Sequence, residues 1–285
     1  MPHRQVVLTI PKRLRGYCLC RRRLLGEIAR VEARTVTAAI RTLTGERDLS
    51  VGIVACLQTH GSRANWHPHL HLAVTDGGFR LDGTFVGWPA QDTARLTEAF
   101  RRAVLRRFVR LDLFDEEQAA GMLTWPHSGF HVHTAVWVPE EYRDFATPLA
   151  RYRARNPVAP ERLNYDRAVM SVTYRSDKSE GPTAGTETVD PLGFLTRVIV
   201  HIPDKGQVTT RYYGWSANRS LGMRRQAEPA PATASPAIVP APRFSPTRPP
   251  AGERRCSSRS SRSTRSRARP AMAPCGSSRA SPGSR

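Results

Sequence analysis

The feature that most constrains this chain is a run of alternating histidines, His-Pro-His-Leu-His at residues 67–71. Side chains alternate between the two faces of a β-strand, so in a strand all three imidazoles project to one side. Apolar residues continue the run to Val74, and Asp-Gly-Gly at 76–78 is a turn signal that ends it. The run therefore predicts a sheet face that carries three imidazoles.

The sequence upstream predicts a partner for this strand. Residues 51–57 read Val-Gly-Ile-Val-Ala-Cys-Leu, which is typical of a second strand, and a loop over 60–65 joins the two. The resulting β-hairpin brings Gln58 back beside the histidines.

The histidine strand and Gln58 together predict a divalent metal site. Imidazole nitrogens two residues apart on a strand can bind one cation together, and the side-chain oxygen of Gln58 can complete a set that leaves positions open for substrate. No cysteine pair with the spacing of a structural zinc site lies nearby. The competing interpretation is that the histidines only cover a polar sheet face.

The charge of the chain favours a nucleic-acid partner. The formal net charge is +20, and only Lys12, Lys178 and Lys205 of the 44 basic residues are lysines. The planar guanidinium of arginine suits bidentate phosphate contacts. A GC-rich genome would produce the same excess of arginine, so composition alone leaves both explanations open.

Cysteine usage and hydropathy indicate the cellular compartment in which the protein works. The five cysteines form no CxxC pair and no secretory framework, no apolar run is long enough to span a membrane, and the N-terminus lacks a signal-peptide core. We therefore expect a cytoplasmic protein without a membrane partner.

Periodicity predicts a mixture of helices and strands along the chain. Further strands are expected at 3–10, 130–138, 169–174 and 207–213, and helices at 19–43, 90–108, 139–155 and 191–201. The strand at 130–138 contains a second His-x-His, at His131 and His133. We expect His131 to be incidental and His133 either to be a satisfied strand histidine or to face the site.

His69-Leu70-His71 with a downstream tyrosine resembles the HUH motif of tyrosine nucleases that act on single-stranded DNA, in which U is an apolar residue. Blocks at 58–78, 150–163, 174–178 and 211–215 resemble transposases of the insertion sequence 91 type, a replicative, rolling-circle-like group. The resemblance covers most of residues 1–226. It implies an α+β fold, with an antiparallel-sheet, ferredoxin-like HUH-endonuclease core and helices on one face.

The resemblance also implies a chemistry. It assigns binding of Mg²⁺ or Mn²⁺ to His69 and His71, and we expect Gln58 to be the third ligand, with His67 and His60 as alternatives. The implied reaction is transposition by nicking and rejoining single-stranded DNA, at transposon ends and target, through a 5′-phosphotyrosine.

Tyr152 is the nucleophile that the resemblance implies among seven tyrosines. It falls in the matching block on an expected helix, where Arg151, Arg153 and Arg155 can bind phosphate and favour the phenolate. Pro148 stands where two-tyrosine relatives have their other tyrosine, which favours a single nucleophile.

A second group of basic residues lies on the expected helix 90–108. These residues either follow a DNA backbone or form a solvated helix face, and they are Arg101, Arg102, Arg106 and Arg107.

The two ends of the chain depart from the family pattern. The Cys-rich zinc-binding segment that usually precedes the first strand is missing, and residues 227–285 are rich in Pro, Arg and Ser. We expect a catalytic domain over 1–226, followed by a disordered tail over 227–285. We further expect the tail to be a frame-shifted reading of what is an ordered C-terminus in the relatives, so that the chain is a truncated copy. Two other functions remain open: an inactive DNA-binding remnant, and a metal-dependent hydrolase that forms no tyrosine adduct.

Overall fold

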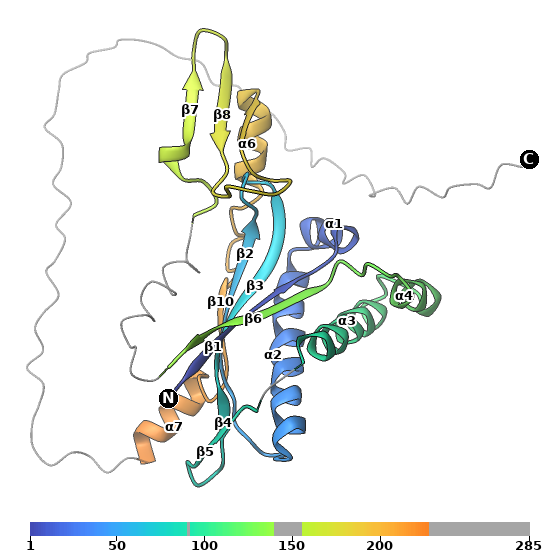
Figure 1. The fold of residues 1–285 in the computed structure, drawn as a ribbon, viewed down its shortest axis with the longest axis vertical. Coiled ribbons are helices and arrows are strands. Elements are labelled where there is room, and N and C mark those ends of the chain that lie inside the picture. Colours follow the sequence, from blue (N-terminus) through green and yellow to red (C-terminus); the bar gives the residue numbers. More distant parts are fainter. Residues whose placement is uncertain (90–91, 140–155, 228–285) are drawn as a thin grey trace, which may run out of the picture. The chain divides into compact units, whose positions relative to one another are not determined.

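A computed structural model describes residues 1–89, 92–139 and 156–227 of the chain. Its central element is a five-stranded antiparallel sheet with the order β10-β2-β3-β1-β6 (Figure 1). The histidine strand is β3, so it lies in the middle of the sheet. The strands are β1 (His3–Thr9), β2 (Gly52–His60), β3 (Trp66–Thr75), β6 (His131–Val138) and β10 (Thr210–Gly214).

The alternation of side chains gives this sheet two unlike faces. Leu70, Leu72 and Val74 of β3 point into the main core together with Val6 and Leu8 of β1. Leu72 is fully buried, and burying such a side chain contributes about 1.5–3 kcal/mol. The histidines, at the intervening positions of β3, point to the opposite face.

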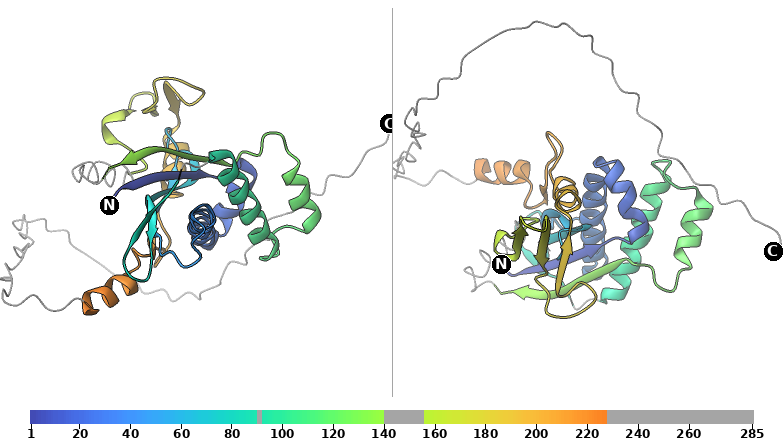
Figure 2. Two further views of the ribbon diagram at one scale, coloured as in Figure 1. Left: turned by 60° about the horizontal axis from the view of Figure 1, so that its bottom comes forward. Right: turned by 90° about the horizontal axis from the view of Figure 1, so that it is seen from above.

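Helices cover the apolar face. Long helices α2 (Arg23–Thr44) and α3 (Thr93–Val109) supply Val36, Ile40 and Phe100 to the core, and they lie on one side of β1 and β6 in Figure 2. Helix α2 ends at Gly45, whose φ of 73° is the left-handed conformation that glycine adopts easily. Shorter helices α1 (Lys12–Cys20) and α4 (Glu116–Leu123) pack around them.

A smaller subdomain lies beyond the end of the β2–β3 hairpin. It consists of the sheet β7 (Leu163–Asp166), β8 (Ser171–Arg175) and β9 (Thr186–Val189), preceded by a 3₁₀ turn at Pro160–Arg162 and followed by α6 (Pro191–Ile199). His201 joins it to the hairpin loop, because its ring nitrogens contact the Ala64 carbonyl oxygen at 2.8 Å and the Thr59 hydroxyl at 3.0 Å. The remaining elements are β4 (Gly77–Phe79), β5 (Phe85–Gly87) and α7 (Asn218–Ala227).

The structure confirms the α+β class, the antiparallel core with helices on one face, and the β2–β3 hairpin. The helix expected over 19–43 is α2, which begins later, at Arg23; residues 19 and 20 instead end α1, a separate helix that was not expected. The turn expected at 76–78 leads directly into β4. The expected helix 139–155 falls mostly outside the described residues, and so does the tail. Within the described ranges, the structure contains no helix of the length and apolarity that crossing a membrane requires.

Candidate functional site: the histidine cleft

A cleft of about 830 Å³ lies over the open face of the central sheet, and we call it the histidine cleft. Its wall opposite the sheet comes from the 3₁₀ turn and the β8 region, through Arg162, Tyr174 and Lys178. A volume of this order accommodates a ligand of nucleotide size. The sheet residues that line it include Gln5, Gln58, His60, His67, His69, His71, His131 and His133.

Strand register places the histidines in two rows across the sheet. In one row His69 pairs with Gln58 on β2 and with Thr9 on β1, and Thr9 pairs in turn with His131 on β6. The second row runs from His71 through Val7 to His133 in the same way. Paired residues of antiparallel strands point to the same face, so both His-x-His motifs face the cleft. The roles expected for His131 and His133 stay predictions.

His69 has the ring state that metal binding requires. Its Nδ1 lies 2.8 Å from the carbonyl oxygen of His67, so Nδ1 must donate a proton there. Burial lowers the pKa of His69, and nearby Arg15 lowers it further, which favours the neutral ring. The lone pair is therefore on Nε2, and a hydrogen bond that fixes the ring in this way is a common feature of metal-binding histidines.

His71 lies directly beside His69. The centroids of the two rings are 4.9 Å apart, and His71 is buried. On its other side, the side-chain nitrogen of Gln5 lies 3.0 Å from Nδ1 of His71. Gln5 was not among the predicted site residues. Because Val6 and Leu8 are apolar and point into the core, alternation along β1 predicts that Gln5 points to the opposite face of the sheet. Its contact with His71, however, depends on how β1 pairs with β3.

The two alternative ligands have other neighbours. Nη1 of Arg15 lies 3.1 Å from Nδ1 of His67, so Nδ1 accepts a hydrogen bond from Arg15 and the proton of the neutral ring is on Nε2. Burial, and then the charge of Arg15, lower the pKa of His67 to about 4. This arrangement makes His67 a poorer ligand than His69. His60 lies near the hairpin loop, with its ring centroid 5.9 Å from that of His201.

The donor set is compatible with a metal ion but small. The described residues contain no group of three or more His, Cys, Asp or Glu side chains that could hold one. The fit therefore rests on the two adjacent imidazoles of His69 and His71 and on the amide of Gln58, which is buried next to His69 in the strand pairing. Metal binding stays a prediction.

The basic residues predicted on the helix lie on α3, which packs against the apolar face of the sheet, away from the cleft. Arg101 donates to the carbonyl oxygens of Met122 and Trp125, and Arg102 pairs with Glu98. Arg107 binds Glu27 through two nitrogens, whereas Arg106 is exposed. Three of the four, Arg101, Arg102 and Arg107, thus have clear structural partners, and contact with DNA stays a prediction for this group.

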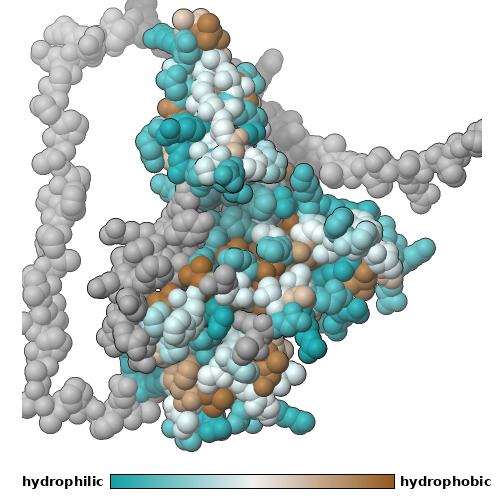
Figure 3. All heavy atoms as spheres, viewed as in Figure 1, coloured by the Kyte–Doolittle hydropathy of each residue, from teal (hydrophilic) through white to brown (hydrophobic). Residues whose placement is uncertain are grey.

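The predicted nucleophile Tyr152 and its neighbours Arg151, Arg153 and Arg155 lie outside the described residues, and so does Pro148. Among the tyrosines that are described, Tyr174 lines the cleft, but it is buried and its hydroxyl accepts a hydrogen bond from the backbone of Ala159. Hydrophobic residues mark the tip of the β7–β8 hairpin at the top of Figure 3, where Val169 and Met170 are exposed.

An α+β core with a paired-histidine strand at its centre is the architecture expected for an HUH-type DNA-processing protein. Comparison with known proteins agrees: residues 52–223 match the family described as "Putative transposase". The chain belongs to this family, the transposases of the insertion sequence 91 type.

Two curated relatives extend this result. The chain is 27% identical over 237 residues to the transposase for insertion sequence element IS801 of Pseudomonas savastanoi pv. phaseolicola, covering 78% of this chain and 56% of the relative. It is 29% identical over 243 residues to "Putative transposase y4qJ" of Sinorhizobium fredii, covering 75% and 58%. The chain thus spans little more than half the length of these relatives. No solved structure matches it.

Proposed function

We propose that this transposase nicks and rejoins single-stranded DNA in the histidine cleft, in a rolling-circle-like transposition. The observation that carries the proposal is the ring state of His69 beside His71, on the central strand of the sheet. A neutral imidazole with a defined tautomer on His69, directly beside the ring of His71, suits the binding of a cation better than the mere covering of a polar face.

His69, His71 and Gln58 are the residues that would hold the ion, Mg²⁺ or Mn²⁺. When bound, such an ion supplies charge that polarises the scissile phosphate and stabilises the leaving 3′ oxygen. The protein contributes further positive charge, because Arg15 and Lys178 both lie close enough to lower the pKa of His67. A phosphodiester in the cleft is therefore favoured electrostatically.

Tyr152 is the proposed nucleophile. Its phenolate oxygen attacks phosphorus, the bond from phosphorus to the 3′ oxygen breaks, and a 5′-phosphotyrosine forms while the 3′ oxygen takes up a proton. The reverse reaction, with a 3′-OH as attacking group, rejoins a strand and releases the tyrosine. The number of phosphodiester-type bonds is conserved, so rejoining needs no external energy source. We propose the cytoplasm as the compartment of this reaction, because the chain is proposed to act on DNA.

A denaturing gel tests the proposal. The full chain is incubated with end-labelled single-stranded oligonucleotides and Mg²⁺ or Mn²⁺, and a slowly migrating protein–DNA band is expected. Tyr152→Phe should abolish this band without loss of DNA affinity. Tyr165→Phe is a matched control, because Tyr165 is exposed and its hydroxyl contacts the sulfur of Met170. An adduct that survives in Tyr152→Phe would overturn the assignment.

The same gel separates the two alternative functions. An inactive DNA-binding remnant would bind the oligonucleotides but give neither adduct nor cleavage under any metal condition. A metal-dependent hydrolase would release cleaved product without an adduct, and chelation with EDTA would stop it.

A further inference from the structure

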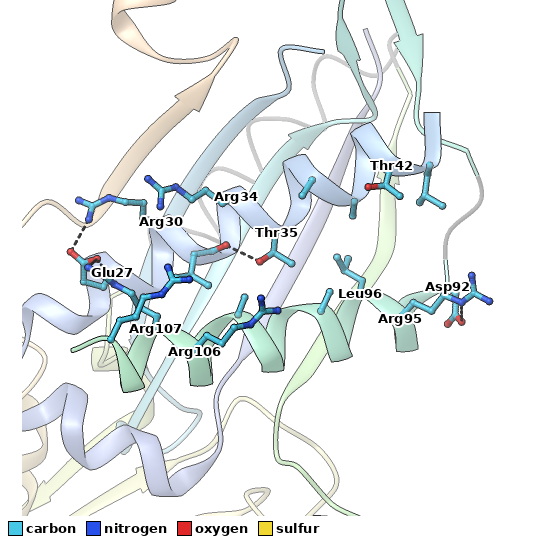
Figure 4. A pocket seen from close by; sticks show the side chains of 17 residues that line it. Glu27, Arg30, Arg34, Thr35, Thr42, Asp92, Arg95, Leu96, Arg106 and Arg107 are labelled. Carbon is cyan, nitrogen blue, oxygen red and sulfur yellow. Dashed lines mark hydrogen bonds and ion pairs between the residues drawn. The ribbon is translucent and has the colours of Figure 1, made fainter. Parts of the chain in front are cut away.

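A second hollow lies on the other side of the molecule, between helices α2 and α3. It is a groove of about 790 Å³, which we call the helix groove (Figure 4). On α2 its lining residues, such as Arg34 and Ala38, alternate with residues that pack into the core, such as Val36 and Ile40. The groove is therefore open on the outer side of the helix layer, and the sheet separates it from the histidine cleft.

The walls of the helix groove are strongly basic. The charged residues that line it are two acids, Glu27 and Asp92, and six arginines, Arg30, Arg34, Arg95, Arg106, Arg107 and Arg110. Figure 4 shows Arg30 and Arg34 of α2 opposite Arg106 and Arg107 of α3, at the same end of the groove. Arg30 and Arg107 share Glu27, so one carboxylate faces a cluster of guanidinium groups.

Three of these arginines form no ion pair with a carboxylate of the described residues. Arg34, Arg106 and Arg110 are exposed, and no acidic side chain in the described part of the chain forms an ion pair with them. Arg106 and Arg110 are one turn apart on α3, as Arg30 and Arg34 are on α2, which spaces each pair by about 6 Å along its helix. Two short rows of cations therefore face each other across the groove.

The floor of the groove has a different character. It is formed mainly by small or apolar side chains, namely Val31, Ala38, Ala39, Leu96, Ala99 and Ala103. Small side chains leave room for a ligand, and apolar ones favour a ligand that has a partly apolar surface of its own.

We propose that the helix groove binds a second segment of single-stranded DNA, with its phosphates on the arginines and its sugars and bases against the floor. Guanidinium forks match phosphate oxygens in a bidentate geometry. A duplex presents phosphates on its outside and keeps its bases stacked within, so it would leave the apolar floor uncovered. None of the described residues that line the groove is aromatic, so binding depends on phosphate contacts and is independent of sequence.

An acidic amphipathic helix is the other occupant that such a groove could take. We favour DNA because every cation of the groove is arginine and because the proposed function brings single strands to this protein; in that respect the inference rests on the proposed function. A strand held on the helix side would be kept apart from the strand in the histidine cleft.

The test is a binding titration of the full chain with a fluorescein-labelled oligo(dT) at several salt concentrations. The test variant carries Arg34→Gln, Arg106→Gln and Arg110→Gln. The control carries Arg21→Gln, Arg23→Gln and Arg47→Gln, which removes the same charge from exposed residues outside both hollows. Thermal melts establish that both are folded.

We expect the test variant to bind about tenfold more weakly near 0.1 M salt, with the slope of log K against log[salt] smaller by about 2, because three phosphate contacts are lost. The control should change affinity less than threefold. Equal losses in the two variants would show a general charge effect and overturn the proposal. A loss of affinity for duplex DNA but not for oligo(dT) would also overturn the proposal. Tighter binding of an acidic helical peptide than of oligo(dT) to the groove would overturn it as well.

The titration is repeated after His69→Ala and His71→Ala have been added to the parent chain and to the groove variant. The difference in oligo(dT) affinity between these two proteins should persist, since the groove is separate from the cleft. This readout does not use strand cleavage, so it stays interpretable if no tyrosine adduct ever forms. Disappearance of the difference in this background would place the arginines and the histidines in one site and overturn the inference.

Discussion

Gln5 and His71 are joined across the central sheet, with the side-chain nitrogen of Gln5 3.0 Å from Nδ1 of His71. In this orientation the amide donates, Nδ1 accepts, and the ring proton of His71 is on Nε2. A half-turn of the amide presents its oxygen instead, which puts the proton on Nδ1 and leaves the lone pair on Nε2. The orientation of the Gln5 amide therefore decides whether Nε2 of His71 has a lone pair with which to bind a cation.

This relationship predicts opposite effects for two substitutions. Gln5→Glu supplies only acceptor oxygens, so it should fix the proton on Nδ1 and keep or strengthen Mn²⁺ binding. Gln5→Leu removes the partner and should weaken Mn²⁺ binding about 10- to 100-fold, as is usual when a group that orients a metal-binding histidine is lost. Calorimetric titration measures both, and the exposed Gln226→Leu is the control. Equal weakening by Glu and Leu would contradict the orienting role.

A second prediction concerns the ligands themselves. His69→Ala and His71→Ala should each abolish the Mn²⁺ site, because their adjacent rings provide the only two imidazoles of the proposed set. His127→Ala is a matched control, since His127 is exposed and does not line the cleft. Unchanged Mn²⁺ binding in both test variants, measured by calorimetry, would remove the metal site from the proposed function.

Local patterns predicted the part of the site that a single hairpin builds. The alternation at residues 67–71 and the strand before it were enough to place Gln58 beside the histidines, because the side-chain period of a strand is two and the loop that joins the pair is short. The structure then pairs Gln58 with His69. Contacts that depend on pairing between distant strands could not be read in this way. The position of Gln5 beside His71 and the alignment of His133 with Val7 both follow from β1 lying between β3 and β6.

Short strands and a buried polar residue were also missed. Strands β7 and β9 have four residues each, too few for a periodic signal. Glu32 of α2 looks like an ordinary polar residue on a helix, yet it is fully buried. Helical periodicity identifies an apolar face, but one polar residue within that face does not disturb the pattern enough to be noticed.

A third prediction follows from the burial of Cys18. Burial raises the pKa of its thiol to about 12, so at pH 8 almost none of it is the reactive thiolate. Cys20, two residues away, is exposed and provides an internal control. Iodoacetamide at pH 8 should alkylate Cys20 and leave Cys18 unmodified until the protein unfolds, which peptide mass spectrometry can measure. Equal modification of the two in the folded protein would show that α1 is not packed as described.

The last prediction concerns Glu32, whose two carboxylate oxygens are buried and form no hydrogen bond with any residue that the structure describes. Burial raises the pKa of this carboxyl well above its ordinary value, so the folded protein keeps Glu32 protonated at a pH where the unfolded chain has lost the proton. A group whose pKa is higher in the folded state favours folding less as pH rises from the unfolded pKa toward the folded one. Glu32→Met should therefore stabilise the protein, and by more at pH 8 than at pH 4.

The size of this effect can be bounded and tested. Removing a buried polar group that has no hydrogen-bond partner raises the free energy of unfolding by about 1–3 kcal/mol. Each kcal/mol raises the melting temperature of a domain this large by about 2–4 °C. Melting temperatures of the parent chain and of Glu32→Met are compared from pH 4 to pH 8, with Glu180→Met as a control at an exposed position. The gap between parent and Glu32→Met should widen as pH rises, while the gap for Glu180→Met stays nearly constant. A gap that narrows with pH would mean that Glu32 is charged in the folded protein and is held there by a cation.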